Sequence, residues 1–312
     1  MSTELIRRTL LVLLFCCGFA AAEQPRLTVI VNDLGNPYFQ ALSASIRATA
    51  REHLGPDASV QVMSSGYDLE RQRRQIEAAR GQGVDLLILT AAHPAALEAD
   101  VEALRAEGTV VVAVDVATAG ARLTITTHNV EAGFIACTQL AQYLNREGRI
   151  AILDGPPVSS IGERNAGCAE ALQRFPRVEI VAWENSGASH LGGIEAMTRL
   201  LSREPELDGV FAINDPAALG AASALEFRGR SDIPIASVDG SPEVVMALRA
   251  GNTPLLNTAA QFPWQIGREA VLRGLALLGT VDHLEETVLI PAELIHRDNA
   301  HQFCDWRRCP ED

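Results

Sequence analysis

Short apolar, β-branched runs alternate along most of the chain with longer segments of helical spacing. Near-continuous apolar runs of this kind predict parallel strands covered by helices on both faces. The runs form two series of four: residues 26–32, 59–64, 85–90 and 109–115, then 149–154, 178–183, 209–214 and 233–239. In the first series the helical segments between the runs begin near Pro37, Leu69 and Ala95. The pattern therefore predicts an α/β protein with two doubly wound parallel-sheet lobes.

The N-terminus has the pattern of a secretion signal. Two arginines and an apolar run, residues 7–20, precede two further alanines and Glu23, so residues 1–22 are interpreted as a cleavable signal peptide. The apolar run is shorter than the ~20 residues that cross a bilayer, which disfavours a membrane anchor, and no later segment could span a membrane. Cys16 allows a lipoprotein interpretation, but Phe15 before it disfavours lipidation. We therefore expect a periplasmic location.

Length and charge narrow the classes of function. With 312 residues, 47% of them hydrophobic, the chain can form two cores. Its formal charge is -13, and removing Glu4, Arg7 and Arg8, a net +1, brings the mature charge to -14. A negative mean field repels nucleic acid. A DNA-binding regulator would also need an N-terminal helix-turn-helix, where this chain has the signal sequence. We therefore expect no nucleic-acid partner.

Four cysteines remain after cleavage. An even number in an oxidising compartment favours disulfides, and Cys304 and Cys309 could close a small loop. Cys137 and Cys168 would then form the second pair. The alternative is that these two are buried thiols on neighbouring helices. No histidine lies at ligand spacing from a Cys-x-x-Cys, so a zinc site is disfavoured.

Polar residues repeat at the carboxyl ends of the predicted strands, where open α/β sheets bind ligands. Asp215 precedes Pro216 and a helical segment, so it is interpreted as a helix cap. Carboxylates and amides from two lobes can hold the hydroxyls of one ligand, and aromatic rings can cover its apolar face. The strand-end residues are Asn32, Asp33, Thr90, Asp115, Asp154, Asn214, Asp215 and Asp239.

An enzymatic function is disfavoured because no hydrolase elbow, zinc-protease helix, P-loop or dinucleotide fingerprint is present. The seven histidines form no ligand set, so neither a metal nor a cofactor is expected. His128 lies beside Asn129 at the inferred crossing between the lobes, where a capping or hinge role is the simplest interpretation.

Seven motifs in order make the sequence similar to a known family. It resembles the ribose-binding-protein-like sugar-binding proteins of ABC importers, which have the type I periplasmic binding protein fold, and the resemblance covers the mature chain. The motifs are NPYF at 36–39, VAVD at 112–115, HNVEAG at 128–133, SSIGERNAGC at 159–168, VFAINDPAALGA at 210–221, VDG at 238–240 and AQFPWQIG at 260–267.

The resemblance implies a three-crossing hinge, with a ligand cleft between the lobes. The crossings are expected near Thr127, Gln261 and Pro291. The N-terminal lobe would comprise residues 23–127 plus 262–290, and the C-terminal lobe residues 128–261 plus 291–312.

The strand ends and the resemblance together predict a set of ligand-binding residues. Tyr38 or Phe39 would form a stacking wall, and Arg164 would contact ring and hydroxyl oxygens. The alternative for Phe39 is core packing, and for Arg164 a surface ion pair. The full set is Asn32, Asp33, Asn36, Tyr38, Phe39, Thr90, Asp115, Arg164, Asn214, Asp239 and Gln261.

The chain also departs from the family pattern. Val116 replaces an arginine, Val238 replaces an aromatic residue, and a third aromatic position falls at Ala188. These changes make the cleft less suited to ribose. Trp183 lies in a predicted strand and is expected in the core, whereas Trp264 fits either a core or a cleft position.

The resulting hypothesis is a monomeric periplasmic solute-binding protein without catalytic activity. It would bind a neutral, polyhydroxylated ligand, a sugar or sugar alcohol, for an inner-membrane ABC permease. The alternative is a binding protein of the same fold that serves a chemoreceptor or sensor kinase.

Overall fold

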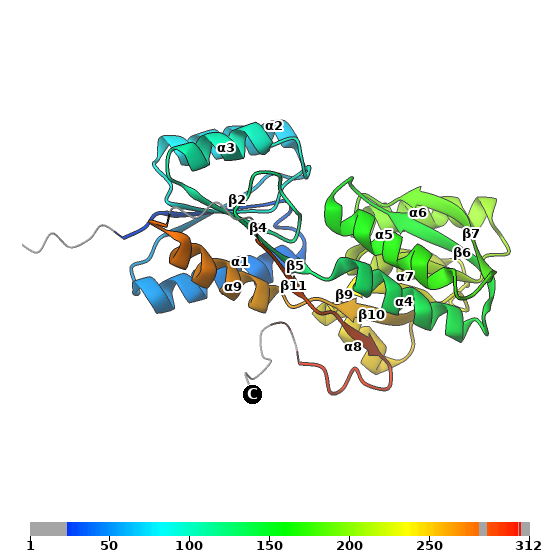
Figure 1. The fold of residues 1–312 in the computed structure, drawn as a ribbon. Helices are drawn as coiled ribbons and strands as arrows, with labels where there is room; N and C mark the ends of the chain where they lie inside the picture. Colours follow the sequence, from blue (N-terminus) through cyan, green and yellow to red (C-terminus); the bar gives the residue numbers. More distant parts are fainter. Residues whose placement is uncertain (1–23, 281–285, 305, 307–312) are drawn as a thin grey trace, which may run out of the picture.

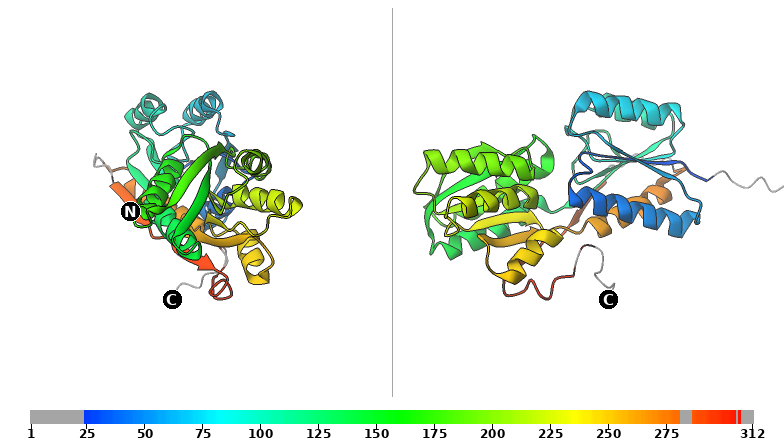
Figure 2. Two further views of the ribbon diagram at one scale, coloured as in Figure 1. Left: turned by 90° about the vertical axis from the view of Figure 1, so that its right-hand side faces the viewer. Right: turned by 180° about the vertical axis from the view of Figure 1, so that it is seen from behind.

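The computed structural model of the chain describes residues 24–280, 286–304 and 306. These residues form two lobes, each a sheet with helices on both faces (Figures 1 and 2). The predicted signal peptide lies outside the described residues. Within the described part of the chain, none of the helices combines the length and the apolar character that crossing a bilayer requires.

The first lobe contains six parallel strands. Strands β1, β3, β4 and β5 are fully buried, because α2 and α3 cover one face of the sheet and α1 and α9 the other (Figure 1). The strand order is β11-β5-β4-β3-β1-β2. The bounds are β1 Leu27–Val31, α1 Pro37–Leu54, β2 Val60–Ser64, α2 Leu69–Gly81, β3 Leu86–Leu89, α3 Glu98–Ala106, β4 Val110–Val114, β5 Leu123–Thr127, α9 Pro263–Leu277 and β11 Glu286–Ile290.

The second lobe repeats the arrangement with one difference. Its strand order is β12-β10-β9-β8-β6-β7, and β12 is antiparallel to β10. The bounds are α4 Asn129–Tyr143, β6 Glu147–Asp154, α5 Ser159–Leu172, β7 Arg177–Asn185, α6 His190–Arg203, β8 Gly209–Ala212, α7 Asp215–Phe227, β9 Ile235–Asp239, α8 Pro242–Ala250, β10 Leu255–Ala260 and β12 Glu293–His296. The prediction of two α/β lobes built on parallel sheets is thus confirmed, and the second sheet carries an antiparallel edge strand.

The sequence pattern identified eight of the strands but not β5, β10, β11 and β12. Threonines in β5 and β10 interrupt the apolar runs on which the prediction relied. The expectation that Trp183 belongs to the core was wrong, because its side chain is 49% exposed. Its strand β7 is the outermost strand of its sheet, and the alternate residues Arg177, Glu179, Trp183 and Asn185 are exposed, so this face of the strand is open to solvent.

The chain passes between the two sheets three times: after β5, after β10 and after β11. Two hydrogen bonds join these crossing segments. The backbone amide of His128 donates to the carbonyl oxygen of Ile290 at 2.8 Å, and the Thr127 hydroxyl donates to Oε1 of Gln261 at 2.7 Å. His128 also caps α4, since its Nδ1 accepts from the amide of Glu131 at 3.1 Å. The capping interpretation of His128 is confirmed.

A disulfide joins the second lobe's first two helices. Cys137 of α4 and Cys168 of α5 are bonded, with their Cα atoms 5.1 Å apart. Both side chains are fully buried. The disulfide interpretation of this pair therefore holds over the alternative of two buried thiols. The other predicted disulfide includes Cys309, which lies outside the described residues.

Candidate binding site between the lobes

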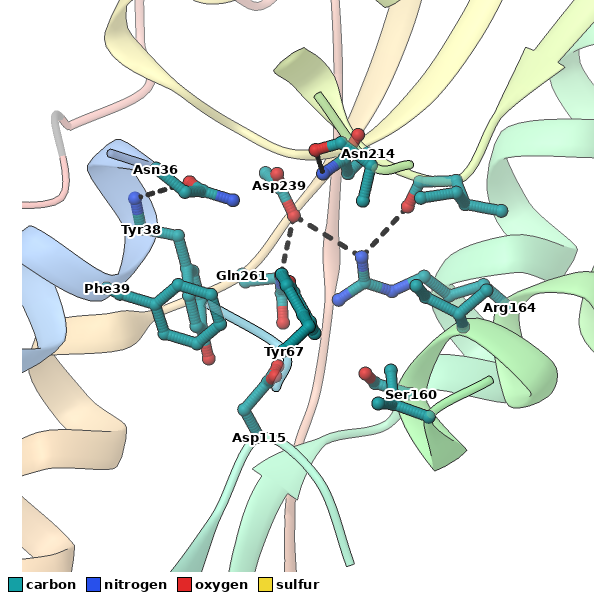
Figure 3. A pocket seen from close by; sticks show the side chains of 14 residues that line it. Asn36, Tyr38, Phe39, Tyr67, Asp115, Ser160, Arg164, Asn214, Asp239 and Gln261 are labelled. Atoms are coloured by element: carbon teal, nitrogen blue, oxygen red, sulfur yellow. Dashed lines mark hydrogen bonds and ion pairs between the residues drawn. The ribbon is translucent and has the colours of Figure 1, made fainter. Parts of the chain in front are cut away.

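A small polar cavity lies between the lobes (Figure 3). Eight of the eleven predicted site residues line it: Asn36, Tyr38, Phe39, Asp115, Arg164, Asn214, Asp239 and Gln261. The structure thus brings together, at the carboxyl ends of both sheets, residues far apart in the sequence.

The loop after β1 supplies the aromatic wall. Asn36 caps α1, since its Oδ1 accepts from the amide of Tyr38 at 2.9 Å, and Pro37 occupies the first helical turn. This geometry points the Tyr38 and Phe39 rings inward, where they meet edge to face with centroids 5.2 Å apart. Phe39 both lines the cavity and belongs to the core, so the core interpretation holds and stacking on a ligand stays a prediction.

The Tyr38 hydroxyl is a buried polar group beside the Asp115 carboxyl group. The side chain is 2% exposed, and its oxygen makes no hydrogen bond of standard geometry to a described residue. Burial, more than the nearby Asp115, raises the pKa of the phenol, which therefore stays neutral. A buried hydroxyl without a partner is destabilising, so a ligand oxygen at this position would be favoured.

Tyr67 is a cavity residue that the sequence analysis missed. It follows β2 and has a backbone φ of 58°, a strained conformation for a residue other than glycine. Burial raises its phenolic pKa, so its hydroxyl is also neutral. An aromatic residue directly after the glycine of the turn that follows a strand could have indicated this role. The other missed residues are Val158, Ser160, Ile161 and Ile213.

Asp115 presents a carboxylate to the cavity from the end of β4. Its backbone φ is 64° and its side chain is almost fully buried. Burial raises its pKa to about 6, while the charge of Arg164 acts in the opposite direction. Strained backbone and a desolvated carboxylate in one residue cost folding free energy, as is common for binding groups.

We expect Asp115→Asn to stabilise the ligand-free protein at neutral pH. The folded pKa is about 6 and the ordinary value is 3.8, so protonation favours the folded state. The stability that protonated Asp115 contributes is present below pH ~4 and lost as the pH rises through ~6. The variant should therefore exceed the wild type by on the order of 3 kcal/mol at pH 7, and this difference should shrink toward zero at pH ~4.

Urea unfolding of both proteins at the two pH values measures this effect. The other buried carboxylates titrate in both proteins, so the difference isolates Asp115. A variant less stable than the wild type at pH 7, or a difference independent of pH, would contradict the expectation.

Arg164 is the cation of the cavity. From α5 its Nε donates to Oδ1 of Asn129 at 2.8 Å, and its Nη1 donates to the carbonyl of Ile213 at 2.8 Å and to Oδ1 of Asp239 at 3.4 Å. The residue is 4% exposed, which excludes a surface ion pair. No described protein group accepts a hydrogen bond from Nη2, which remains for a ligand oxygen (Figure 3).

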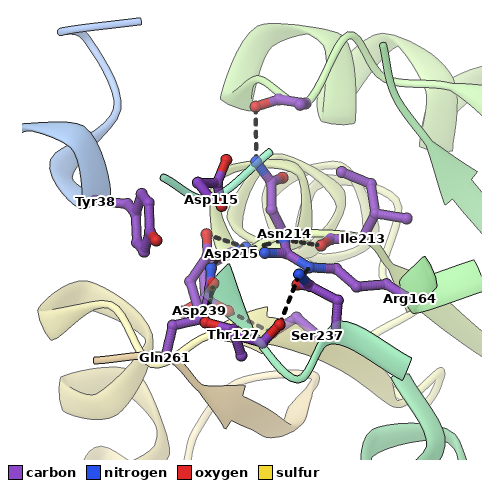
Figure 4. A network of polar contacts seen from close by, with 12 residues as sticks. Tyr38, Asp115, Thr127, Arg164, Ile213, Asn214, Asp215, Ser237, Asp239 and Gln261 are labelled. Carbon is purple, nitrogen blue, oxygen red and sulfur yellow. Dashed lines mark hydrogen bonds and ion pairs between the residues drawn. The ribbon is translucent and has the colours of Figure 1, made fainter. Parts of the chain in front are cut away.

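Asp239 and Gln261 link the cavity to the hinge. Oδ1 of Asp239 accepts from Nε2 of Gln261 at 2.7 Å, and Oε1 of Gln261 accepts from the hydroxyl of Thr127 at 2.7 Å (Figure 4). Asp239 has a φ of 140°, a second strained carboxylate position at a strand end. The Asp239 side chain is therefore bound to one crossing segment directly, through Gln261, and to a second indirectly, through Thr127.

The interpretation of Asp215 as a helix cap was wrong. The preceding residue caps α7, since Oδ1 of Asn214 accepts from the amide of Ala217 at 3.0 Å and its Nδ2 donates to the carbonyl of Ala188 at 2.9 Å. The helix begins one residue earlier than the position of Pro216 suggested, because proline is tolerated throughout the first turn.

Asp215 instead forms a buried network behind the cavity (Figure 4). Its carboxylate accepts from the hydroxyls of Ser237 at 2.6 Å and Thr258 at 2.8 Å, and from the amide of Ser241 at 2.6 Å. The amide of Asp215 in turn donates to Oδ2 of Asp239 at 3.3 Å. Burial raises the pKa of both Asp215 and Asp239, and their mutual repulsion adds to the rise for Asp239.

Three predicted site residues lie outside the cavity. Asn32 is fully buried, and its amide donates to the carbonyl of Ala91 at 3.2 Å. Thr90 is also buried beneath the surface of the cleft. Asp33 lines a neighbouring groove and accepts from the amide of Gly35 at 2.8 Å. A strand end is recognisable from the local sequence, but the local sequence does not indicate which of its side chains line the cavity.

The structure also shows where the three substituted family positions and Trp264 lie. Ala188, at the position of an expected aromatic residue, lines the cavity, whereas Val116 and Val238 are buried and do not. Trp264 packs against the core. Among the described residues, no group of three or more acidic, histidine or cysteine side chains could hold a metal ion.

Two α/β lobes that enclose a polar cavity at the carboxyl ends of their sheets define a two-lobed ligand-binding protein. The profile of the family described as periplasmic binding protein domain matches residues 27–279, and the chain belongs to this family.

Curated relatives match most of the chain. The ribose import binding protein of Bacillus subtilis is 28% identical over 243 residues, 77% of each chain. The D-apiose import binding protein of Actinobacillus succinogenes is 26% identical and covers 96% of this chain and 97% of its own. The Caulobacter myo-inositol binding protein, solved with myo-inositol, has a TM-score of 0.82 at 22% identity, covering 90% of this chain and 96% of its own. At this identity the structural match establishes the fold alone.

Proposed function

We propose that the protein is a periplasmic binding protein that captures a neutral sugar or sugar alcohol and delivers it, as a monomer and without catalysis, to an inner-membrane ABC permease. The observation that carries the proposal is one cavity with a buried carboxylate from each lobe, Asp115 and Asp239, and one arginine, Arg164. Carboxylates accept paired hydrogen bonds from adjacent hydroxyls, and arginine donates to their oxygens. The sugar and polyol names of the relatives support the same ligand class.

Capture follows from the position of the cavity. Asp115 belongs to the first lobe and Asp239 to the second, so a ligand that contacts both is bound fully only when the lobes are closed. Such a ligand shifts the population toward the closed form through its differential affinity. The hinge connection through Gln261 would couple this closure to Asp239.

The charge of the cavity favours a neutral ligand. Asp115 and Asp239 line the cavity and Asp215 lies behind it, whereas Arg164 is the arginine that lines it. An anionic sugar would add a further negative charge within a few ångströms of buried carboxylates, where screening by water is weak. A carboxylated or phosphorylated sugar should therefore bind less tightly than a neutral one.

D-ribose should not be the tightest ligand. The family pattern has an arginine after the first-lobe carboxylate, and Val116 cannot donate hydrogen bonds in its place. Ala188 also provides a smaller wall than an aromatic ring would, which leaves more room in the cavity. A different pentose, a hexose or a sugar alcohol would use that space.

A thermal-shift screen on refolded, ligand-stripped protein tests the proposal, because a ligand bound only to the folded state raises the melting temperature. The panel should contain neutral sugars, polyols and acidic sugars, followed by calorimetry on every compound that shifts the protein. We expect a neutral compound to bind tightest. Tighter binding of an acidic sugar than of every neutral one would refute the assignment.

A further inference from the structure

Helices α4 and α5 touch at the level of their backbones. A Cβ atom on Gly133 would lie 1.9 Å from the carbonyl oxygen of Arg164, and one on Gly167 would lie 1.9 Å from the carbonyl oxygen of Val130. Real contacts of this kind are far longer, so any side chain at either glycine would force the helices apart. The two glycines therefore set the distance between α4 and the backbone of the cavity arginine.

The disulfide lies in the same interface between α4 and α5 as the glycine contacts. Cys137 lies one turn beyond Gly133 on α4, and Cys168 directly follows Gly167 on α5. The covalent bond holds the two Cα atoms 5.1 Å apart in the fully buried interface. At the cysteines, α4 and α5 are therefore linked covalently.

The same two helices also meet at the guanidinium group of Arg164, which lies in the cavity. Asn129 lies one turn before Gly133, and its Oδ1 accepts from Nε of Arg164 at 2.8 Å. The amide of Asn129 is itself anchored, since its Nδ2 donates to the hydroxyl of Thr126 at 3.2 Å and to the carbonyl of Thr127 at 3.0 Å. Asn129 therefore transmits the position of α4 to the arginine side chain.

The contact between Arg164 and Asp239 is sensitive to small shifts. Nη1 lies 3.4 Å from Oδ1 of Asp239, longer than the ~2.7–2.9 Å of a strong charge-assisted hydrogen bond. A displacement of α5 by a few tenths of an ångström would either tighten or break this contact. Hydrogen-bond energy changes steeply in this range of distance.

We propose that the Cys137–Cys168 disulfide, acting through the glycine contacts of α4 and α5, is a positioning device for the Arg164 guanidinium. Neither cysteine touches the cavity, yet the bond between them sets where the cation of the cavity lies. The consequence for ligand capture rests on the proposed function, whereas the position of the side chain does not.

The rival explanation is that the disulfide only stabilises the lobe by closing a loop with a sequence separation of 31. Loss of a general stabiliser would increase the exchange of all protected hydrogens in the lobe together. Loss of a positioning contact would affect Arg164 selectively. The Nε–H of Arg249, which donates to the carbonyl of Ala300 at 2.8 Å in the same lobe, provides the internal reference.

The test measures side-chain Nε–H exchange of the ligand-free mature protein by ¹H–¹⁵N NMR. The peaks are assigned by their loss in Arg164→Gln and Arg249→Gln. In the double variant Cys137→Ala/Cys168→Ala, we expect the Arg164 exchange rate to rise at least ~10-fold and that of Arg249 to stay within ~2-fold. Met197→Ala, a buried substitution in α6, serves as a control for lost stability, in which the two arginines should change together.

Parallel changes of Arg164 and Arg249 in the cysteine variant, or an unchanged Arg164, would overturn the proposal. A second variant, Cys137→Val/Cys168→Ala, replaces part of the lost volume with methyl groups in case the first does not fold. Failure of both to fold would also overturn it, because the disulfide would then act on the whole lobe. Since no ligand is used, the outcome is independent of whether the protein binds sugars.

Discussion

Asp239→Ala should weaken ligand binding by ~10- to 100-fold or more, since a charge-assisted hydrogen bond contributes about 1.5–3 kcal/mol. The substitution removes the second lobe's carboxylate from the cavity. It also removes an acceptor of both Gln261 and Arg164, so two buried donors lose a hydrogen-bond partner. Calorimetry with the tightest neutral ligand of the screen measures the loss.

Asp154→Ala is the matched control for Asp239→Ala. Asp154 also ends a strand of the second sheet, and its Oδ1 accepts from the amide of Asn165 at 2.8 Å, but it does not line the cavity. Its substitution should change affinity by less than ~3-fold, in keeping with a residue that makes no ligand hydrogen bond. Equal effects of the two substitutions, or none from Asp239→Ala, would place the ligand elsewhere.

Asp215→Ala should lower the free energy of unfolding by about 3 kcal/mol. The substitution leaves the hydroxyls of Ser237 and Thr258 and the amide of Ser241 without their buried acceptor. Each unpaired buried donor is destabilising by about 1–3 kcal/mol, and relief of the repulsion between Asp215 and Asp239 offsets part of the sum. Denaturant unfolding at pH 7 measures the effect.

Asp232→Ala is the control for this stability change. Asp232 is exposed and pairs with Arg230, so its loss should change stability by less than ~1 kcal/mol. A comparable loss in both variants would mean that the buried network around Asp215 contributes no more to the free energy of unfolding than an exposed ion pair does. If the Asp215→Ala protein is as stable as the wild type, burial of the carboxylate destabilises the fold by as much as its hydrogen bonds stabilise it.

The apolar runs were sufficient for the architecture because strands buried on both faces must be apolar along their whole length. They did not reveal β5 and β10. Threonines in these strands donate hydrogen bonds from their hydroxyls within the fold, and they lower the hydrophobicity of the segment. The apolar runs also misplaced Trp183, because strand order decides which strand lies at an edge, and strand order depends on long-range pairing.

The sequence also indicated most of the cavity, since a strand end is defined locally and parallel strands end at a common edge. Asp115, Asn214 and Asp239 were found in this way and line the cavity. Thr90 and Asn32 satisfy the same local criterion but are buried below it. Depth beneath the cleft depends on the opposing lobe, which no local pattern describes.

By itself, the sequence determined two α/β lobes, a polar junction between them and the residue types that suit a hydroxylated ligand, because periodicity and strand-end chemistry are local properties. Only the tertiary structure decided that Asn214 and not Asp215 caps its helix, that Tyr67 joins the cavity, and that a disulfide lies in line with Arg164. These facts depend on which elements approach one another and how closely. Three features arise only in the packed chain: backbone contact at glycines, buried donors that require an acceptor, and the meeting of two lobes.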